Sequence, residues 1–157
     1  MPYSIISTFI CKLGIRVENE TITKIDFVAP EAELIIPKDK LSKLAAEQFQ
    51  AYCENPHFKF DLPIIYHGTA FQQQLWKYLP TIITGTTQTY TEVAQALNSG
   101  ARAIGNACRR NPLPLIFPCH RVVAKHKLGG FSGHQHGYYL SIKEKLLTHE
   151  GVQGKRI

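Results

Sequence analysis

One short stretch, residues 111–123, carries the residue types best suited to chemistry and reads NPLPLIFPCHRVV. Pro118 constrains the backbone directly before Cys119, so we expect the thiol at a fixed bend. A thiolate is a strong nucleophile, but a free cysteine with a pKa of about 8.5 is only about 3% ionised at pH 7. A catalytic thiol therefore needs a base, and His120 is adjacent to it. Glu150 is available to orient that imidazole, as the third group of a catalytic triad does.

The other cysteines and histidines show no pattern of this kind. Cysteine is among the residue types most often buried, so a structural thiol is the alternative interpretation of Cys119. No C-x-x-C pair is present, which argues against a zinc site or a disulfide framework, so we expect reduced thiols and a cytoplasmic protein. His134 and His136 are more typical of a polar loop than of a metal site, and we expect no metal. The cysteines without an adjacent base are Cys11, Cys53 and Cys108.

The positive charge of the chain is concentrated in its second half. The 157 residues are 44% hydrophobic and 19% charged, which is typical of a globular protein rather than a disordered one. Residues 1–78 hold eight Lys/Arg and nine Asp/Glu, whereas residues 79–157 hold ten and three. This asymmetry favours a polyanionic partner, with nucleic acid first and an acidic membrane surface second; a basic protein without such a partner is the alternative. No apolar run approaches the roughly 20 residues of a membrane helix, so we expect no membrane span.

The first lobe, residues 1–62, has the pattern of a small α+β unit. Three segments rich in β-branched and aromatic residues predict an antiparallel sheet, with Asn19 and Glu20 as the turn between the last two. Apolar residues at helical spacing then predict a helix over residues 41–53. Residues 56–68 contain two prolines and are expected to link this lobe to the next. The predicted strands are residues 3–10, 14–18 and 21–28.

The second lobe, residues 63–157, is predicted to be mostly helical, and two of its short helices resemble a helix-turn-helix. Thr89 and Glu92 have the capping-box spacing, so a helix is expected to begin there. A tight turn follows, in which Ser99 is expected to cap a second helix over residues 101–110. DNA binding is the functional interpretation, although helix pairs of this kind that bind no DNA are commoner. The second helix carries Arg102, Arg109 and Arg110 on one side.

The pentapeptide Pro118-Cys-His-Arg-Val122 resembles the signature of the O6-alkylguanine-DNA alkyltransferases, also called methylated-DNA–protein-cysteine methyltransferases. The similarity spans residues 68–151, just over half of the chain, while the first lobe matches the family only in size and strand-rich character. The further matching motifs are Gly68-Thr-Ala-Phe-Gln72, Leu75-Trp76, Gly85, Thr89-Tyr90, Arg102-Ala-Ile-Gly105, Asn111-Pro112, Gly129-Gly-Phe-Ser-Gly133, Lys143-Glu-Lys-Leu-Leu147 and Glu150-Gly151.

This resemblance implies a fold and a reaction. The fold is α+β, with a three-stranded antiparallel sheet and a helix in the first lobe, and a helix-turn-helix and an active-site loop in the second. The reaction is DNA repair, in which the alkyl group of O6-alkylguanine, or of O4-alkylthymine, passes irreversibly to Cys119 of the protein. The target base must leave the duplex stack to be reached. The implied partner is double-stranded DNA carrying the lesion, bound by a monomer or by several copies along the DNA, without a cofactor.

The resemblance also assigns roles to individual residues. Cys119 is the alkyl acceptor, His120 is its base through a water molecule, and Glu150 orients His120. Asn111 braces the active-site turn, and Tyr90 protonates the leaving guanine. Arg102 enters the base stack in place of the flipped nucleotide. The base pocket is expected to comprise Cys119, Val122, Ser132 and Lys143, and the other DNA-binding residues are expected to be Thr89, Tyr90, Ala101, Arg109 and Arg110.

Two departures from the family pattern bear on these assignments. The chain is slightly shorter between Tyr90 and Arg102, which changes the turn of the helix pair. It is longer between Ser132 and Lys143, in a loop that borders the pocket and affects which alkyl groups fit. Two alternatives remain: a non-catalytic lesion sensor of the same fold, against which Cys119 argues, and a Cys-His hydrolase, which would turn over.

Overall fold

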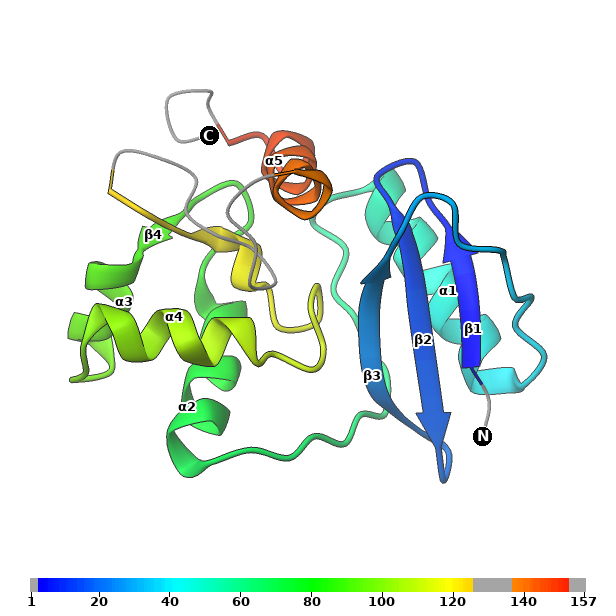
Figure 1. Cartoon of the computed structure of the whole chain (residues 1–157), viewed down its shortest axis with the longest axis horizontal. Coiled ribbons are helices and arrows are strands. Elements are labelled where there is room, and N and C mark those ends of the chain that lie inside the picture. The colour runs from blue at the N-terminus through cyan, green and yellow to red at the C-terminus, as the bar shows by residue number, and fades with distance from the viewer. Residues whose placement is uncertain (1–2, 126–136, 153–157) are drawn as a thin grey trace. The chain divides into compact units, whose positions relative to one another are not determined.

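The computed structural model describes residues 3–125 and 137–152. The chain divides into two compact units, Met1–Tyr66 and His67–Ile157 (Figure 1). The first contains an antiparallel sheet with a helix, and the second is mostly helical, so the predicted α+β fold is confirmed. Among the described residues, none of the helices has the length and apolar character needed to cross a membrane.

The sheet of the first unit has the strand order β1-β2-β3 (Figure 1). β1 spans Tyr3–Ser7, β2 spans Lys12–Glu18 and β3 spans Thr21–Val28, so the third strand has its predicted bounds. Asn19 and Glu20 have φ angles of 48° and 59°. Positive φ at both central residues is the geometry of a type I′ turn, whose twist matches the strands that it joins.

The first strand ends earlier than the sequence predicts, because residues 8–11 form a turn. The backbone N–H and the hydroxyl of Thr8 both donate to the carbonyl of Cys11, at 2.9 and 2.8 Å. The same hydroxyl accepts the Cys11 N–H at 3.1 Å. This local network satisfies backbone groups that a longer first strand would pair across the sheet. The second strand, β2, begins at Lys12, earlier than the predicted start at residue 14.

The helix of this unit, α1 (Lys40–Glu54), packs against β1 and β2. Asp39 caps it by accepting the Ser42 N–H at 3.0 Å, and the extended backbone of Asn55 ends it. Ala45 and Phe49 are fully buried, so the apolar face of the helix covers the sheet and gives this unit a core of its own.

Most of the segment that we expected to link the lobes is bonded to the first unit instead. Phe60 packs against Phe49 with ring centroids 5.3 Å apart. The Gln48 side chain donates to the Asp61 carbonyl and accepts its N–H, both at 2.9 Å. Beyond this, Ile22 donates to the Pro63 carbonyl at 2.8 Å and accepts from Ile65 at 3.1 Å. The two prolines therefore do not produce a free linker.

The second unit is assembled from short elements around a buried core. The indole N–H of Trp76 donates to the Ala107 carbonyl at 2.9 Å and ties α2 to α4. Two short parallel strands, β4 and β5, pair Gln88 with Val122 and Thr89 with Val123. The elements are α2 (Ala70–Tyr78), the 3-10 turn η1 (Leu79–Thr81), β4 (Gln88–Thr89), α3 (Tyr90–Ala96), α4 (Ala101–Arg109), the 3-10 turn η2 (Cys119–Arg121), β5 (Val122–Val123) and α5 (Tyr138–His149).

The helix-turn-helix pair consists of α3 and α4, which pack against each other. The predicted capping box at the start of α3 is confirmed: Thr89 accepts the Glu92 N–H at 3.0 Å and Glu92 accepts the Thr89 N–H at 3.1 Å. The prediction that Ser99 caps α4 is wrong, because Gly100 is the N-cap and makes no side-chain bond. Ser99 instead donates its N–H to Ala94 at 2.8 Å, which completes a Schellman motif around the left-handed Asn98.

Candidate active site

The loop before Cys119 reverses direction, although residues 115–117 are a short apolar run of the kind that often forms a strand. Leu115 has a φ of +76°, and the Phe117 N–H donates to the Leu113 carbonyl at 2.8 Å. Pro114 has no backbone N–H to donate to a neighbouring strand, and it forms an isolated β-bridge with Phe117. A left-handed, non-glycine residue is uncommon, and here it turns the chain so that the 3-10 turn η2 can begin at Cys119.

Asn111 braces this loop with both ends of its amide. Its Nδ2 donates to the Phe117 carbonyl at 2.8 Å, and its Oδ1 accepts the Leu113 N–H at 2.9 Å. The Phe117 carbonyl also accepts the backbone N–H of Cys119, at 2.8 Å. One side chain therefore joins the two arms of the loop, next to the backbone that carries the thiol.

The structure brings His120 and Glu150 together. His120 Nε2 lies 2.8 Å from Glu150 Oε2, and the two residues are 1% and 5% exposed. An ionised carboxylate only accepts hydrogen bonds, so Nε2 carries the ring proton and Nδ1 is left as the acceptor. This is the arrangement in which a histidine serves as a general base with an orienting carboxylate behind it.

The end of α5 places Glu150. Glu150 is the C-cap, and Gly151 follows with a φ of 85°. The Gly151 N–H donates to Thr148 at 3.0 Å and the Val152 N–H donates to Leu147 at 2.9 Å, which is a Schellman motif. Val152 and Leu147 also pack together with Val123 of β5. The sequence Glu150-Gly151 thus delivers a carboxylate at a defined point beside η2.

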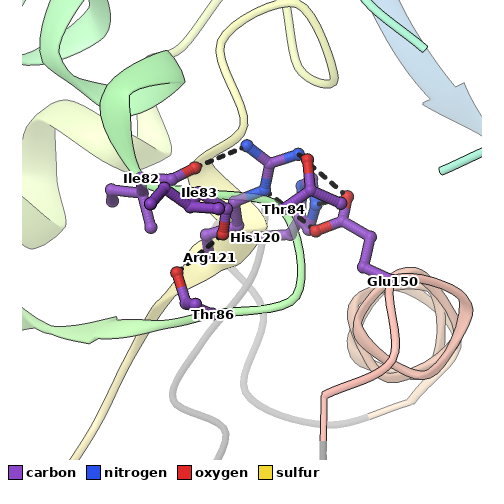
Figure 2. Close-up of polar contacts among 7 residues, drawn as sticks. All are labelled: Ile82, Ile83, Thr84, Thr86, His120, Arg121 and Glu150. Carbon is purple, nitrogen blue, oxygen red and sulfur yellow. Dashed lines mark hydrogen bonds and ion pairs between the residues drawn. The ribbon is translucent and has the colours of Figure 1, made fainter. Parts of the chain in front are cut away.

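Arg121 received no role from the sequence, yet its guanidinium makes four hydrogen bonds in the site. Its Nε donates to Glu150 Oε1 at 2.9 Å and its Nη2 to Glu150 Oε2 at 3.2 Å (Figure 2). Nη1 donates to the Ile82 carbonyl at 2.8 Å and Nη2 to the Thr84 hydroxyl at 3.1 Å. The position of Arg121 directly after His120 could have indicated its role, because a guanidinium that is buried beside an active-site histidine needs a carboxylate partner.

Lys143 is a second cation of the site, beside Arg121, and is 1% exposed. Its Nζ donates to the Val122 carbonyl at 2.8 Å and lies 5.9 Å from the centroid of the Tyr90 ring. Burial lowers the pKa of Lys143 to about 8, although the thiols of Cys119 and Cys108 oppose this shift. The ammonium is therefore charged at pH 7 and attracts negative charge on either sulfur.

The thiol of Cys119 is not ionised at rest. Burial raises the pKa of Cys119, and the opposing effects of Asn111, Lys143 and a backbone hydrogen bond do not overcome it. Burial likewise lowers the pKa of His120, against the attraction of Glu150. Burial alone would raise the pKa of Glu150, but His120 and Arg121 outweigh it and hold that pKa below its ordinary value. The resting site has a neutral thiol, a neutral imidazole and a carboxylate.

The residues expected to bind DNA lie on α3 and α4. Thr89 is the N-cap of α3 and Tyr90 is its first residue. A Cβ at Gly105 of α4 would lie 3.9 Å from Tyr90, so the two helices meet at this ring. Ser132 lies outside the described residues. The exposed members of the set, all on α4, are Ala101, Arg102, Arg109 and Arg110.

A buried thiol with a histidine and a carboxylate beside it, in a lobe that also holds a helix-turn-helix, defines a DNA-binding protein equipped for nucleophilic group transfer. The family model for the DNA-binding domain of 6-O-methylguanine DNA methyltransferase matches residues 70–152. A methylated-DNA–protein-cysteine methyltransferase of Methanosarcina barkeri is 36% identical over 157 residues, covering 96% of this chain and 97% of its own.

Solved structures agree with this assignment. The O6-methylguanine methyltransferase of Mycobacterium tuberculosis has a TM-score of 0.73 and 30% identity, over 95% of this chain and 92% of its own. A structure of the same organism's OGT in complex with DNA has a TM-score of 0.75 and 32% identity, with the same coverage. The chain belongs to the 6-O-methylguanine DNA methyltransferase family. It is accordingly a methylated-DNA–protein-cysteine methyltransferase, and the resemblance seen in the sequence is confirmed.

Proposed function

We propose that this chain repairs duplex DNA by moving an alkyl group from O6 of guanine, or from O4 of thymine, to the sulfur of Cys119, once per molecule. The observation that carries the proposal is the 2.8 Å contact between His120 Nε2 and Glu150 Oε2, directly beside the cysteine in sequence and in a buried site. This contact orients a neutral base, and a base is what a protonated thiol lacks.

The proposed reaction moves one proton, one alkyl group and one electron pair. The Cys119 proton passes through a water molecule to Nδ1 of His120, and the thiolate attacks the alkyl carbon. A carbon–sulfur bond forms while the bond from carbon to O6 breaks and leaves its electron pair on the guanine. Tyr90 donates a proton to that guanine, and the proton held by His120 returns through solvent to Tyr90, so that in net the thiol proton has passed to the guanine. The product is a thioether, which has no proton to lose and cannot act again.

The proposed DNA contacts follow from the exposure of α4 and from the charge of the second half of the chain. Arg102 stands near the start of α4 and is proposed to enter the stack when the damaged base leaves it. Arg109 and Arg110 stand at the other end and are proposed to contact phosphates, as are Thr89 and Ala101. Val122, Ser132 and Lys143 are proposed to line the base pocket together with Cys119.

Further assignments accompany this proposal. We assign DNA binding and alkyl transfer to residues 63–157 and leave residues 1–62 as a separate α+β lobe. The assignment of DNA binding and alkyl transfer to residues 63–157 is supported by the family match over residues 70–152. We propose a monomer, able to bind in several copies along DNA. The cytoplasm is the proposed compartment, which the four free thiols favour.

Stoichiometry tests the central proposal. The protein is incubated with excess duplex DNA carrying O6-methylguanine, and the protein is then analysed by mass spectrometry. We expect one methyl group per molecule, located on the peptide that contains Cys119, and no transfer by Cys119→Ser. Cys53→Ser is the matched control and should react like the parent chain. Continued turnover would support a hydrolase instead, and a methyl group on another residue would overturn the assignment of the acceptor.

A further inference from the structure

Arg121 lies in the active-site turn, and its guanidinium holds the carboxylate that lies behind the imidazole. Both oxygens of Glu150 accept from its guanidinium, Oε1 at 2.9 Å and Oε2 at 3.2 Å. Oε2 is also the oxygen that lies 2.8 Å from His120 Nε2. The orientation of the carboxylate toward the histidine is therefore set jointly by both donors.

The guanidinium is itself held by a second segment of the chain. Nη1 donates to the Ile82 carbonyl at 2.8 Å and Nη2 to the Thr84 hydroxyl at 3.1 Å, both in the segment between η1 and β4 (Figure 2). Gly85 follows in the same segment, and a Cβ there would lie 3.1 Å from the Glu150 carbonyl oxygen. Arg121 thus bridges the end of α5 to a segment almost forty residues earlier in the chain.

We propose that Arg121 is a positioning residue for alkyl transfer, which holds the Glu150 carboxylate in the orientation that accepts the His120 ring proton, and which is itself aligned by Ile82 and Thr84. This inference rests on the proposed function, because it concerns the base of that reaction. A planar fork with donors on several sides can bind a carboxylate and two further acceptors at once, which a lysine ammonium cannot do with the same geometry.

A positioning role has an electrostatic consequence that a purely structural role lacks. The charged groups that act on His120 are Glu150 and Lys143 of α5 and Arg121 of its own turn, and the Ile82–Thr84 segment presents a carbonyl and a hydroxyl. Removing the cation while the carboxylate stays makes protonation of the imidazole easier. The acid limb of the pH–rate profile should then move to higher pH.

The test uses the whole chain and the free base O6-benzylguanine, which requires no DNA binding. The rate of benzyl transfer to Cys119 is measured in single-turnover reactions between about pH 5 and pH 9, the range in which histidines titrate. We expect Arg121→Met to react at least tenfold more slowly, on the order of the loss when a general base is displaced, with its acid limb at higher pH. Arg121→Lys should lose rate but keep the acid limb of the parent chain. Arg16→Met, which removes an exposed arginine from β2, is the control.

A second pair of variants tests the positioning role of Arg121 even if the Arg121→Met variant does not fold. Thr84→Val removes one acceptor of the Arg121 guanidinium and should slow transfer by about two- to fivefold, the effect of one hydrogen bond. Thr86→Val removes a hydroxyl of the same segment that donates only to the nearby Ile83 carbonyl, and it should leave the rate unchanged (Figure 2).

Three results would overturn the positioning role: an unchanged acid limb in folded Arg121→Met, full activity of Arg121→Lys, or equal rates for Thr84→Val and Thr86→Val. Absence of benzyl transfer in the parent chain would instead contradict the proposed function itself, so the two failures are distinguishable.

Discussion

Replacing Lys143 with methionine should make the protein more stable while it slows the reaction. Burial lowers the pKa of this lysine from 10.5 to about 8, so the folded state holds a charged ammonium at pH 7 at a cost. One pKa unit corresponds to about 1.4 kcal/mol, which makes this cost about 3 kcal/mol. The Lys143→Met variant loses the hydrogen bond to the Val122 carbonyl, worth about 1 kcal/mol. The expected net gain in the free energy of unfolding is therefore about 2 kcal/mol.

Urea unfolding at pH 7 measures this gain, with Lys145→Met as the control. Lys145 lies on the exposed side of the same helix, and its replacement should change the free energy of unfolding by no more than about 0.5 kcal/mol. A Lys143→Met variant that unfolds at lower urea than the parent chain would refute the reasoning, because the ammonium would then stabilise the fold. Alkyl transfer should be slower in this variant, since no cation then attracts the developing thiolate.

Lys143→Met should also change how the free energy of unfolding depends on pH. Between pH 8 and pH 10.5 the folded state has released the Lys143 proton, while the unfolded chain still holds it. The unfolded state then binds more protons, so stability contributed by this group rises with pH across that interval. The raised pKa values of the buried cysteines act in the opposite direction in both proteins, so the slope of stability against pH should be more positive in the parent chain than in Lys143→Met. Equal slopes in the two proteins would mean that Lys143 keeps its ordinary pKa in the fold.

Three further variants test the DNA contact and the turns that place Glu150. Arg102→Ala should slow repair of O6-methylguanine in duplex DNA much more than its reaction with free O6-benzylguanine, measured as single-turnover rates; equal losses would contradict its role in the base stack. Gly151→Ala should lower the free energy of unfolding, measured by thermal unfolding, by about 1–2 kcal/mol. The φ of 85° accounts for this loss by itself, since the added Cβ would meet no atom within 4 Å. Gly85→Ala should lower the free energy of unfolding by more, since its Cβ would also meet the Glu150 carbonyl oxygen at 3.1 Å. Equal losses in the two variants would show that this contact does not affect stability.

The features that sequence predicted well depend on neighbours in the chain. The capping box of Thr89 and Glu92 needs only residues three apart, and it begins α3 where expected. The turn at Asn19 and Glu20 follows from two residues able to adopt positive φ between β-branched runs. The proximity of His120 to Glu150 was inferred from the family resemblance and from the residue types, and the fold brings them to 2.8 Å.

The features that sequence missed depend on backbone conformations set by the surrounding loop or on partners far away in the chain. Residues 115–117 are apolar and bounded by prolines, a pattern that fits a strand, but a left-handed Leu115 braced through Asn111 overrides it. Ser99 is a good capping residue by type, yet the Schellman motif takes its N–H and Gly100 becomes the N-cap. The four acceptors of Arg121 come from segments nearly thirty and forty residues away, which no local pattern records.

The direction of the Cys119 pKa shift matters most for the mechanism, because it shows that the thiol is activated by proton transfer during the reaction and not by ionisation beforehand. Burial favours the neutral forms of Cys119 and His120, so neither is ionised before the reaction. Transfer of one proton between them creates a thiolate and an imidazolium, and each new charge then has an opposite charge available: Lys143 for the sulfur and Glu150 for the ring. In a buried site such attractions are stronger than in water. The same burial that suppresses ionisation of either group alone therefore favours their joint ionisation, and the thiol becomes nucleophilic only as its proton leaves for the histidine.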